Sequence, residues 1–203
     1  MEILFLRIEI VGMELDQVKI DELLIKLDGT VDKSNLGANA ILAVSLCVIK
    51  AMAKIQNKEL YEILSNGKVS MPIPMMNILN GGKHADNNLD IQEFMIVPIL
   101  KTEHERIRAA CEIFITLKQM LKEDGFVTSV GDEGGFAPNL KNNEESFKYL
   151  VEAIKKSGYI PGKEVSIAID AAASEFYDKD KKVYVLDGKE YTSVYMHLHS
   201  INV

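Results

Sequence analysis

Two adjacent carboxylates between glycines are the residues of this sequence that most suggest chemistry. Residues 131–138 have the sequence Gly-Asp-Glu-Gly-Gly-Phe-Ala-Pro. Glycine adopts backbone angles that other residues avoid, so we expect a tight, shaped loop. If the segment is extended, Asp132 and Glu133 point in opposite directions, and only one of them can face a given cavity. A carboxyl group held in such a loop is a candidate for proton transfer. The alternative interpretation is a solvated acidic turn.

Other polar residues lie where predicted strands end. In α/β barrels, ligands collect at the carboxyl ends of the strands, so these side chains could converge on one pocket. The set comprises His84, Gln92, Glu93, Glu133 and Asp170. Each has a structural alternative: His84 could be a loop histidine, Glu93 an ordinary strand residue, and Asp170 either the cap of the following turn or a metal ligand. His197 and His199 share a face if extended, but two histidines alone indicate a metal site only weakly.

The composition is that of an ordinary globular protein. Of 203 residues, 47% are hydrophobic and 26% charged, and the net charge of −7 argues against non-specific binding to nucleic acid or membrane surfaces. Cys47 and Cys111 lie in apolar helical patterns, which predicts buried, reduced thiols. The apolar stretch 36–49 is shorter than a membrane span requires and predicts a core helix. We find no convincing signal peptide and expect a cytoplasmic protein with no membrane span.

The elements that would position these residues begin with two helices. Asp16 can cap a helix that Gly29 ends, and a second helix follows Ser34, with its apolar face at Ala38, Ile41, Leu42, Ser45, Leu46 and Ile49. This part of the sequence predicts a helical hairpin.

Strands and helices then alternate. Residues 91–98 predict a strand, Thr102 with Glu105 a capping box for a helix that ends at Gly125, and Asn142 the start of a further helix. Residues 165–169 are nearly all apolar, as in a buried parallel strand, and Asp170 follows them. From about residue 71 onward this order indicates an α/β architecture.

Several segments together resemble the enolase family (phosphopyruvate hydratase). Residues 131–139 are one of them, and the similarity runs from about residue 10 to residue 192. The other segments are Leu-Asp-Gly-Thr at 27–30, Lys-Ser-Asn-Leu-Gly-Ala-Asn-Ala-Ile at 33–41, Pro-Met-Met-Asn at 74–77, Asn-Gly-Gly-Lys-His-Ala-Asp-Asn-Asn at 80–88, Gln-Glu-Phe-Met at 92–95 and Ile-Asp-Ala-Ala-Ala-Ser-Glu-Phe-Tyr at 169–177.

The resemblance implies a fold and a domain division. We expect an α/β chain: a partial enolase-type (β/α) barrel, with the first strands and helices only, preceded by a helical remnant of the family's amino-terminal α+β domain. Residues 1–70 would be that remnant, 71–193 the first part of the barrel and 194–203 a tail outside the family pattern.

The resemblance also implies an activity, the Mg²⁺-dependent dehydration of 2-phosphoglycerate to phosphoenolpyruvate in glycolysis. Glu133 is then the general acid, or shares that role with Glu93; His84, Gln92 and Glu93 match substrate-contacting positions, and Asp170 matches a magnesium ligand. Mg²⁺ suits such an oxygen-rich site.

We expect the chain to be an enolase truncated at both ends. The family's lysine base, its two other acidic metal ligands and its mobile serine loop find no counterpart in the sequence, which predicts an isolated chain without meaningful activity. Alternatives are a non-catalytic remnant or interaction protein, or one half of a split enolase. Homo-oligomers, or a complementing enolase chain that covers the open barrel, are the expected partners.

Overall fold

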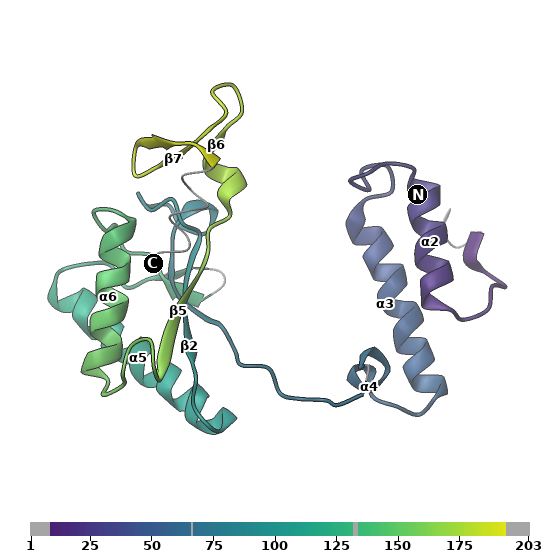
Figure 1. Ribbon diagram of the computed structural model, residues 1–203, viewed down its shortest axis with the longest axis horizontal. Coiled ribbons are helices and arrows are strands. Elements are labelled where there is room, and N and C mark those ends of the chain that lie inside the picture. Colours follow the sequence, from purple (N-terminus) through teal and green to yellow (C-terminus); the bar gives the residue numbers. More distant parts are fainter. Residues whose placement is uncertain (1–8, 66, 132–133, 194–203) are drawn as a thin grey trace. The chain divides into compact units, whose positions relative to one another are not determined.

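In the computed structural model, which describes residues 9–65, 67–131 and 134–193, the chain divides into two units, Met1–Met71 and Pro72–Val203 (Figure 1). The first unit contains the predicted helical hairpin. Helix α2 (Gln17–Asp28) begins where Asp16 accepts a hydrogen bond from the backbone N–H of Lys19 at 3.2 Å. It ends at Gly29, whose φ of 73° is a left-handed conformation that glycine adopts without strain.

Helix α3 (Ala38–Ile55) packs against α2, and the short helix α4 (Leu60–Leu64) follows it. The hydrophobic cluster between the helices contains the buried residues Ile20, Leu24, Ile41 and Val48. The predicted apolar face of α3 is only partly right, because Leu42 and Leu46 are 57% and 42% exposed. Helix α3 contacts α2 and the short helix α4, and these two helices cover only part of its surface.

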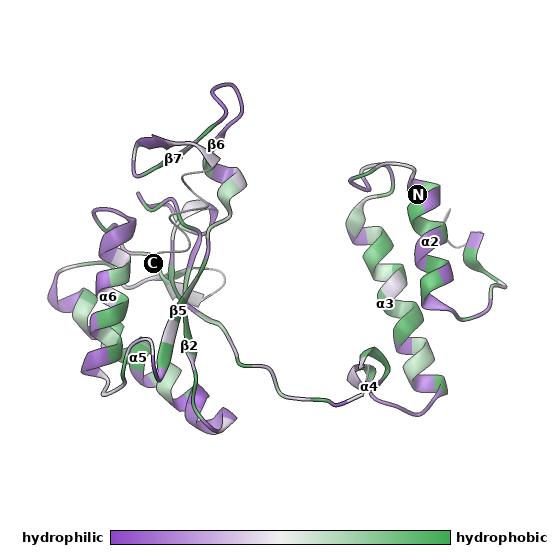
Figure 2. Ribbon diagram, viewed as in Figure 1, coloured by the Kyte–Doolittle hydropathy of each residue, from purple (hydrophilic) through white to green (hydrophobic). Residues whose placement is uncertain are grey.

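Helix α3 is apolar along most of its length (Figure 2). Its length and mean hydropathy of 1.7 are sufficient for a membrane span, and it is the one described helix that meets this test. Core helices of water-soluble proteins have the same properties, so length and composition alone do not distinguish the two.

The loop between α2 and α3 is organised by the buried carboxylate of Asp28. It accepts hydrogen bonds from the N–H of Leu36 at 2.7 Å, the N–H of Thr30 at 3.0 Å and the hydroxyl of Thr30. Burial by itself raises the pKa of Asp28, but these hydrogen bonds stabilise the charged form, and the net effect lowers the pKa below 3.8.

The second unit is built on a five-stranded mixed sheet with the order β3-β4-β1-β2-β5. A three-stranded meander follows at the carboxyl-terminal end of the described chain. The bounds are β1 Met76–Asn80, β2 Glu93–Pro98, β3 Val130–Gly131, β4 Gly134–Phe136 and β5 Val165–Asp170 in the sheet, and β6 Tyr177–Asp178, β7 Val183–Leu186 and β8 Lys189–Tyr191 in the meander.

The prediction of a buried parallel strand at 165–169 is wrong. Strand β5 pairs antiparallel with β2, from Glu93↔Asp170 to Pro98↔Val165, and only Val165 is fully buried. Strand β5 lies at the end of the sheet and so has one pairing neighbour, which leaves Ile169 43% exposed. The parallel pairing in this sheet lies instead between β1 and β4, at Leu79↔Phe136.

Helices α5 (Glu103–Glu123) and α6 (Asn143–Lys156) pack on the sheet and on each other (Figure 1). The core between them is apolar and includes the fully buried Phe94 and Phe136. The Phe136 ring stacks on Phe114 of α5 at a centroid distance of 4.2 Å, and Phe94 meets Phe147 of α6 edge-on at 5.3 Å. An α/β fold with helices on a mixed sheet is therefore confirmed.

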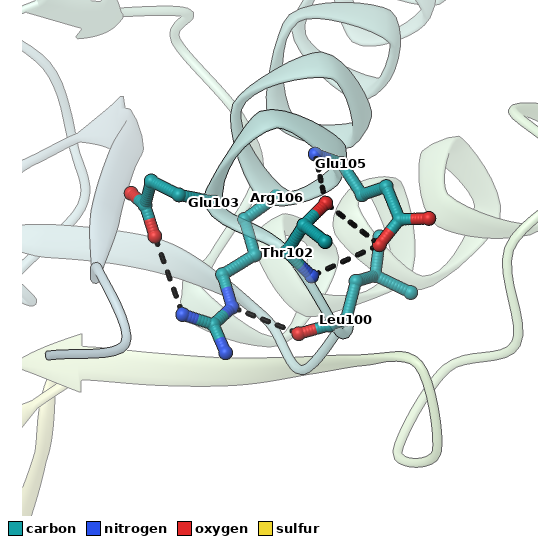
Figure 3. A network of polar contacts seen from close by, with 5 residues as sticks. All are labelled: Leu100, Thr102, Glu103, Glu105 and Arg106. Carbon is teal, nitrogen blue, oxygen red and sulfur yellow. Dashed lines mark hydrogen bonds and ion pairs between the residues drawn. The ribbon is translucent and has the colours of Figure 1, made fainter. Parts of the chain in front are cut away.

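The start of α5 is the predicted capping box (Figure 3). The N–H of Glu105 donates to the hydroxyl of Thr102 at 3.2 Å, and the carboxylate of Glu105 accepts from the N–H of Thr102 at 2.9 Å. Hydrogen bonds from the hydroxyl and N–H of Thr102 lower the pKa of Glu105. Arg106 adds a bond to the carbonyl of Leu100 and an ion pair with Glu103 at 3.2 Å.

The prediction of buried thiols is also wrong. Cys47 in α3 and Cys111 in α5 are both free and exposed. When apolar residues occur all around a helix, their pattern does not identify the face that packs against the rest of the protein. Cys47 and Cys111 lie on the solvent-facing side of their helices.

Candidate active site

The candidate site lies at one edge of the sheet, where Asn80, Glu93 and Asp170 occupy one row across β1, β2 and β5. The register pairs Asn80 with Glu93 and Glu93 with Asp170. Residues directly opposite each other in antiparallel strands point to the same face, with Cβ atoms about 4.5–5.5 Å apart. Two carboxylates are therefore neighbours on one face of the sheet.

The direction of β2 produces this arrangement. Glu93 begins β2, whereas Asn80 and Asp170 end β1 and β5. Because β2 runs antiparallel to both neighbours, its first residue lies at the same edge as their last residues. Glu93 therefore lies at the expected edge of the sheet, but at the start of its strand and not at the predicted strand end.

His84 lies beside Glu93. It is the last residue of the short 3-10 helix η1 (Gly82–His84), and its Nδ1 is 3.3 Å from Oε1 of Glu93. The side chains are 24% and 16% exposed, so the pair is largely shielded from water. An imidazole in contact with a carboxylate can exchange or share a proton, which is the behaviour that acid–base chemistry requires.

Two glycines bring η1 close to the start of β2. A Cβ on Gly81 would lie 2.5 Å from the carbonyl oxygen of Ile91, and one on Gly82 would lie 3.3 Å from the Cα of Gln92. The N–H of Gly81 donates to the carbonyl of Gln92 at 3.0 Å. This close approach keeps the predicted residues His84, Gln92 and Glu93 together.

Asp170 is exposed at the end of β5, and its Oδ1 accepts a hydrogen bond from the N–H of Ala172 at 3.1 Å. The turn-capping alternative for Asp170 is thus present in the structure. One oxygen in a turn does not prevent a carboxylate from binding a cation, because a carboxylate has about four acceptor positions.

The segment 131–138 joins the same edge through its described residues. Asp132 and Glu133 themselves lie outside the described residues. Strands β3 and β4 pair antiparallel at Gly131↔Gly134, and β4 adjoins β1. The predicted shaped loop is therefore bounded by strands of the site's own sheet.

Contacts that the sequence argument missed tie these segments together. Asn87 donates from Nδ2 to the carbonyls of Asn80 and Pro138, each at 3.0 Å. Lys83, next to His84, forms an ion pair with Glu175 at 3.3 Å, in the 3-10 helix η2 (Ala173–Phe176) that follows Asp170. The signal available in the sequence was the Asp-Asn-Asn run at 86–88, since asparagine side chains commonly hydrogen-bond backbone groups in turns.

The buried Asn143 makes a second set of such contacts. Its Nδ2 donates to Asp90 at 3.1 Å and to Asp187 at 2.8 Å, and its Oδ1 accepts from the N–H groups of Asp90 and Ile91. Asn143 thereby fastens the loop before Gln92 to the start of α6 and to the turn between β7 and β8.

Metal-binding capacity is limited in the described part of the chain. Its residues contain no group of three or more His, Cys, Asp or Glu side chains that could together hold a metal ion. Glu93 and Asp170 offer hard oxygen ligands of the kind that Mg²⁺ prefers, so the donors fit this ion in type. Two hollows, of about 350 Å³ at the end of α3 and about 420 Å³ beside α5 and α6, include none of the predicted site residues.

Comparison with known protein families gives two matches that together cover most of the sequence. Residues 5–64 match the enolase N-terminal domain. Residues 68–201 match the enolase C-terminal TIM barrel domain, and this match extends past Ser193 into the segment that the sequence analysis assigned to a tail. The second match contains Asn80, Glu93 and Asp170, which form the row at the edge of the sheet. With both domains of the family matched, the chain belongs to the enolase family.

Proposed function

We propose that this chain carries part of an enolase site for the Mg²⁺-dependent dehydration of 2-phosphoglycerate to phosphoenolpyruvate. In this proposal Glu133, alone or with Glu93, donates the proton to the leaving hydroxide. His84 and Gln92, with Glu93, contact the substrate, and Asp170 is a ligand of Mg²⁺.

The observation that carries the proposal is the row of Glu93 beside Asp170, with His84 in contact with Glu93. These residues come from three separate segments of the sequence. A sheet needs no imidazole and two carboxylates at one edge for stability, and neighbouring like charges on adjacent strands are unfavourable. Their grouping is better explained by binding and chemistry.

Each residue has a task that its environment suits. Expulsion of hydroxide requires a general acid, and the largely shielded Glu93 with His84 beside it can hold and transfer a proton. Asp170, exposed at the strand end, is open to a cation and substrate. When bound, Mg²⁺ would supply positive charge against the carboxylate of the substrate, where negative charge develops during the reaction.

We further propose that the 203-residue chain alone turns over its substrate very slowly. Asp170 provides one ligand, and the described residues contain no cluster that completes a metal site. An enolase site without a positioned base would be slower by about 10²–10⁴. A site without the cationic groups that stabilise the transition state would be slower by about 10²–10³ for each group, although such losses do not simply multiply.

The second candidate is a role through association, with another enolase chain or a further copy. The observation that favours it is the sheet end at β5, where Ile169 is 43% exposed. An edge strand with unpaired backbone groups can pair with another chain. We propose a cytoplasmic location in either case, because the acidic composition and the two free thiols suit it.

A coupled assay of the purified chain with 2-phosphoglycerate and Mg²⁺ tests the catalytic proposal, alone and with an added enolase fragment that carries the rest of the barrel. We expect negligible turnover alone and measurable turnover with the fragment. Turnover near that of a complete enolase from the chain alone would refute the proposed inactivity. No turnover from a demonstrated complex of the two would refute the catalytic assignment.

Variants make this test specific. Glu93→Gln and Asp170→Asn should each abolish the complemented turnover. Asp178→Asn is the matched control: Asp178 also accepts hydrogen bonds from its own following turn, at the N–H groups of Asp180 and Lys181, but it lies outside the row. Equal losses from Asp170→Asn and Asp178→Asn would show that Asp170 has only a turn-forming role.

A further inference from the structure

The buried amide of Asn143 lies against the backbone that leads into β2. Asn143 is the first residue of α6 and is 3% exposed. Its Oδ1 accepts hydrogen bonds from the N–H groups of Asp90 and Ile91, both at 3.1 Å. Its Nδ2 donates to the carboxylates of Asp90 and Asp187, at 3.1 and 2.8 Å. The oxygen and the nitrogen of this amide therefore each have two partners, and all of them lie outside α6.

The segment that Asn143 holds has no regular secondary structure of its own. Residues 85–92 lie outside helices and strands, and the ladder of β2 begins only at Glu93. The N–H of Ile91 is buried together with the amide that accepts its hydrogen bond. A buried N–H that loses its acceptor is unfavourable, so without Asn143 the segment would have to move to find another partner.

The same segment supports η1, which carries His84. The N–H of Gly82 donates to the carbonyl of Leu89 at 2.7 Å. A Cβ on Gly81 would lie 2.5 Å from the Cβ of Leu89, so the two stretches of backbone are in close contact. The N–H of His84 in turn donates to the carbonyl of Gly81 at 3.0 Å. A shift of the segment before β2 would therefore move His84.

We propose that Asn143 is a positioning residue of the site: by fixing the backbone that leads into β2, it sets the contact between His84 and Glu93. His84 belongs to η1, which packs on this backbone, and Glu93 directly follows it. The distance of 3.3 Å between Nδ1 of His84 and Oε1 of Glu93 therefore depends on where this backbone lies. The inference rests on the proposed function in one respect, the use of this pair in catalysis.

The test uses nitrogen-15 NMR of the whole chain with labelled histidine, at one fixed pH. His84→Gln identifies the ring signals of His84, and Glu93→Gln shows how they move when the carboxylate is removed. We expect Asn143→Ala to move the His84 signals in the same direction as Glu93→Gln. Amide hydrogen exchange at Ile91 should become at least about tenfold faster, as expected when a buried hydrogen bond is lost.

Asn143→Ser provides a second variant in case the alanine variant does not fold. The serine hydroxyl is polar but lies one bond closer to the backbone than the amide oxygen. It should therefore not reach the N–H groups of Asp90 and Ile91, and we expect the same changes as in Asn143→Ala.

Asn142→Ala is the matched control. Asn142 is the adjacent asparagine, and its side chain accepts a hydrogen bond from the N–H of Glu145 at 3.0 Å within its own helix. Its loss should lower the melting temperature, as the loss of a helix cap does, without moving the His84 signals. Unchanged His84 signals in the folded Asn143 variants, or an equal change in Asn142→Ala, would overturn the proposal.

This readout separates the two proposals because it requires no turnover. If the His84 signals respond only to the Asn143 variants while the complemented chain fails in the coupled assay, the positioning role stands and the catalytic assignment falls. If turnover is recovered but the His84 signals ignore Asn143, the catalytic assignment stands and the positioning role falls.

Discussion

Replacing Phe136 with alanine should be among the most damaging single changes in the second unit. The ring is 0% exposed, directly follows the glycine pair, and stacks on Phe114 with planes 16° apart. Truncation of a buried phenylalanine to alanine costs about 3–5 kcal/mol through lost burial and the cavity left behind. Within that cost, the stacked pair accounts for about 0.5–1.5 kcal/mol.

Urea denaturation followed by tyrosine fluorescence measures this loss. With a denaturant slope of about 2 kcal/mol per molar, within the usual range for urea, the unfolding midpoint should fall by roughly 2 M. Phe126→Ala is the control, because Phe126 is only partly buried and meets Tyr149 edge-on at 6.0 Å; its loss should be clearly smaller.

A double-mutant cycle with Phe114→Ala isolates the ring pair. We expect a coupling energy of about 0.5–1.5 kcal/mol, since the two rings are in direct contact. A loss below about 1 kcal/mol for Phe136→Ala, where burial predicts about 3–5, would refute the packing argument. So would equal losses for Phe136→Ala and Phe126→Ala, because the reasoning ties the magnitude to complete burial.

Three further predictions concern separate features. The hydrogen bonds that lower the pKa of Asp28 below 3.8 stabilise the first unit above that pH, and the stability is lost as pH falls through the lowered value; circular dichroism should show acid unfolding that Asp28→Asn makes much less pH-dependent. Thr102→Ala should destabilise α5 by about 0.5–2 kcal/mol, measured by thermal melting, and Thr116→Ala, outside the cap, should cost less. Cys47 and Cys111 should both react with a thiol reagent in the native chain, and labelling that requires denaturant would contradict their exposure.

The sequence identified local structure well where the cause is local. Asp16, Gly29, Thr102 and Asn142 mark helix ends because a side chain or a glycine within three or four residues satisfies the helix terminus. The family resemblance likewise rests on short segments that stand in the sequence as written, and both family domains were found.

The buried face of each helix and the pairing of the strands were predicted less well, because both depend on residues that are distant in the sequence. The exposure of Leu42 and Cys111 follows from which face of each helix finds a partner, and hydrophobicity alone does not reveal that face. The antiparallel pairing of β5 depends on β2, which lies about seventy residues earlier in the chain.

The sequence by itself determined the chemistry available to this protein: His84, Gln92, Glu93, Glu133 and Asp170, with glycines that permit close approach. Only the tertiary structure decided how the described members of this set meet. The reversed direction of β2 brings its first residue beside the last residues of β1 and β5, and the amide of Asn143 holds the backbone before β2, more than fifty residues away. The partner and the direction of each strand depend on contacts between segments that are far apart in the sequence, and the pattern within one strand does not identify its partner.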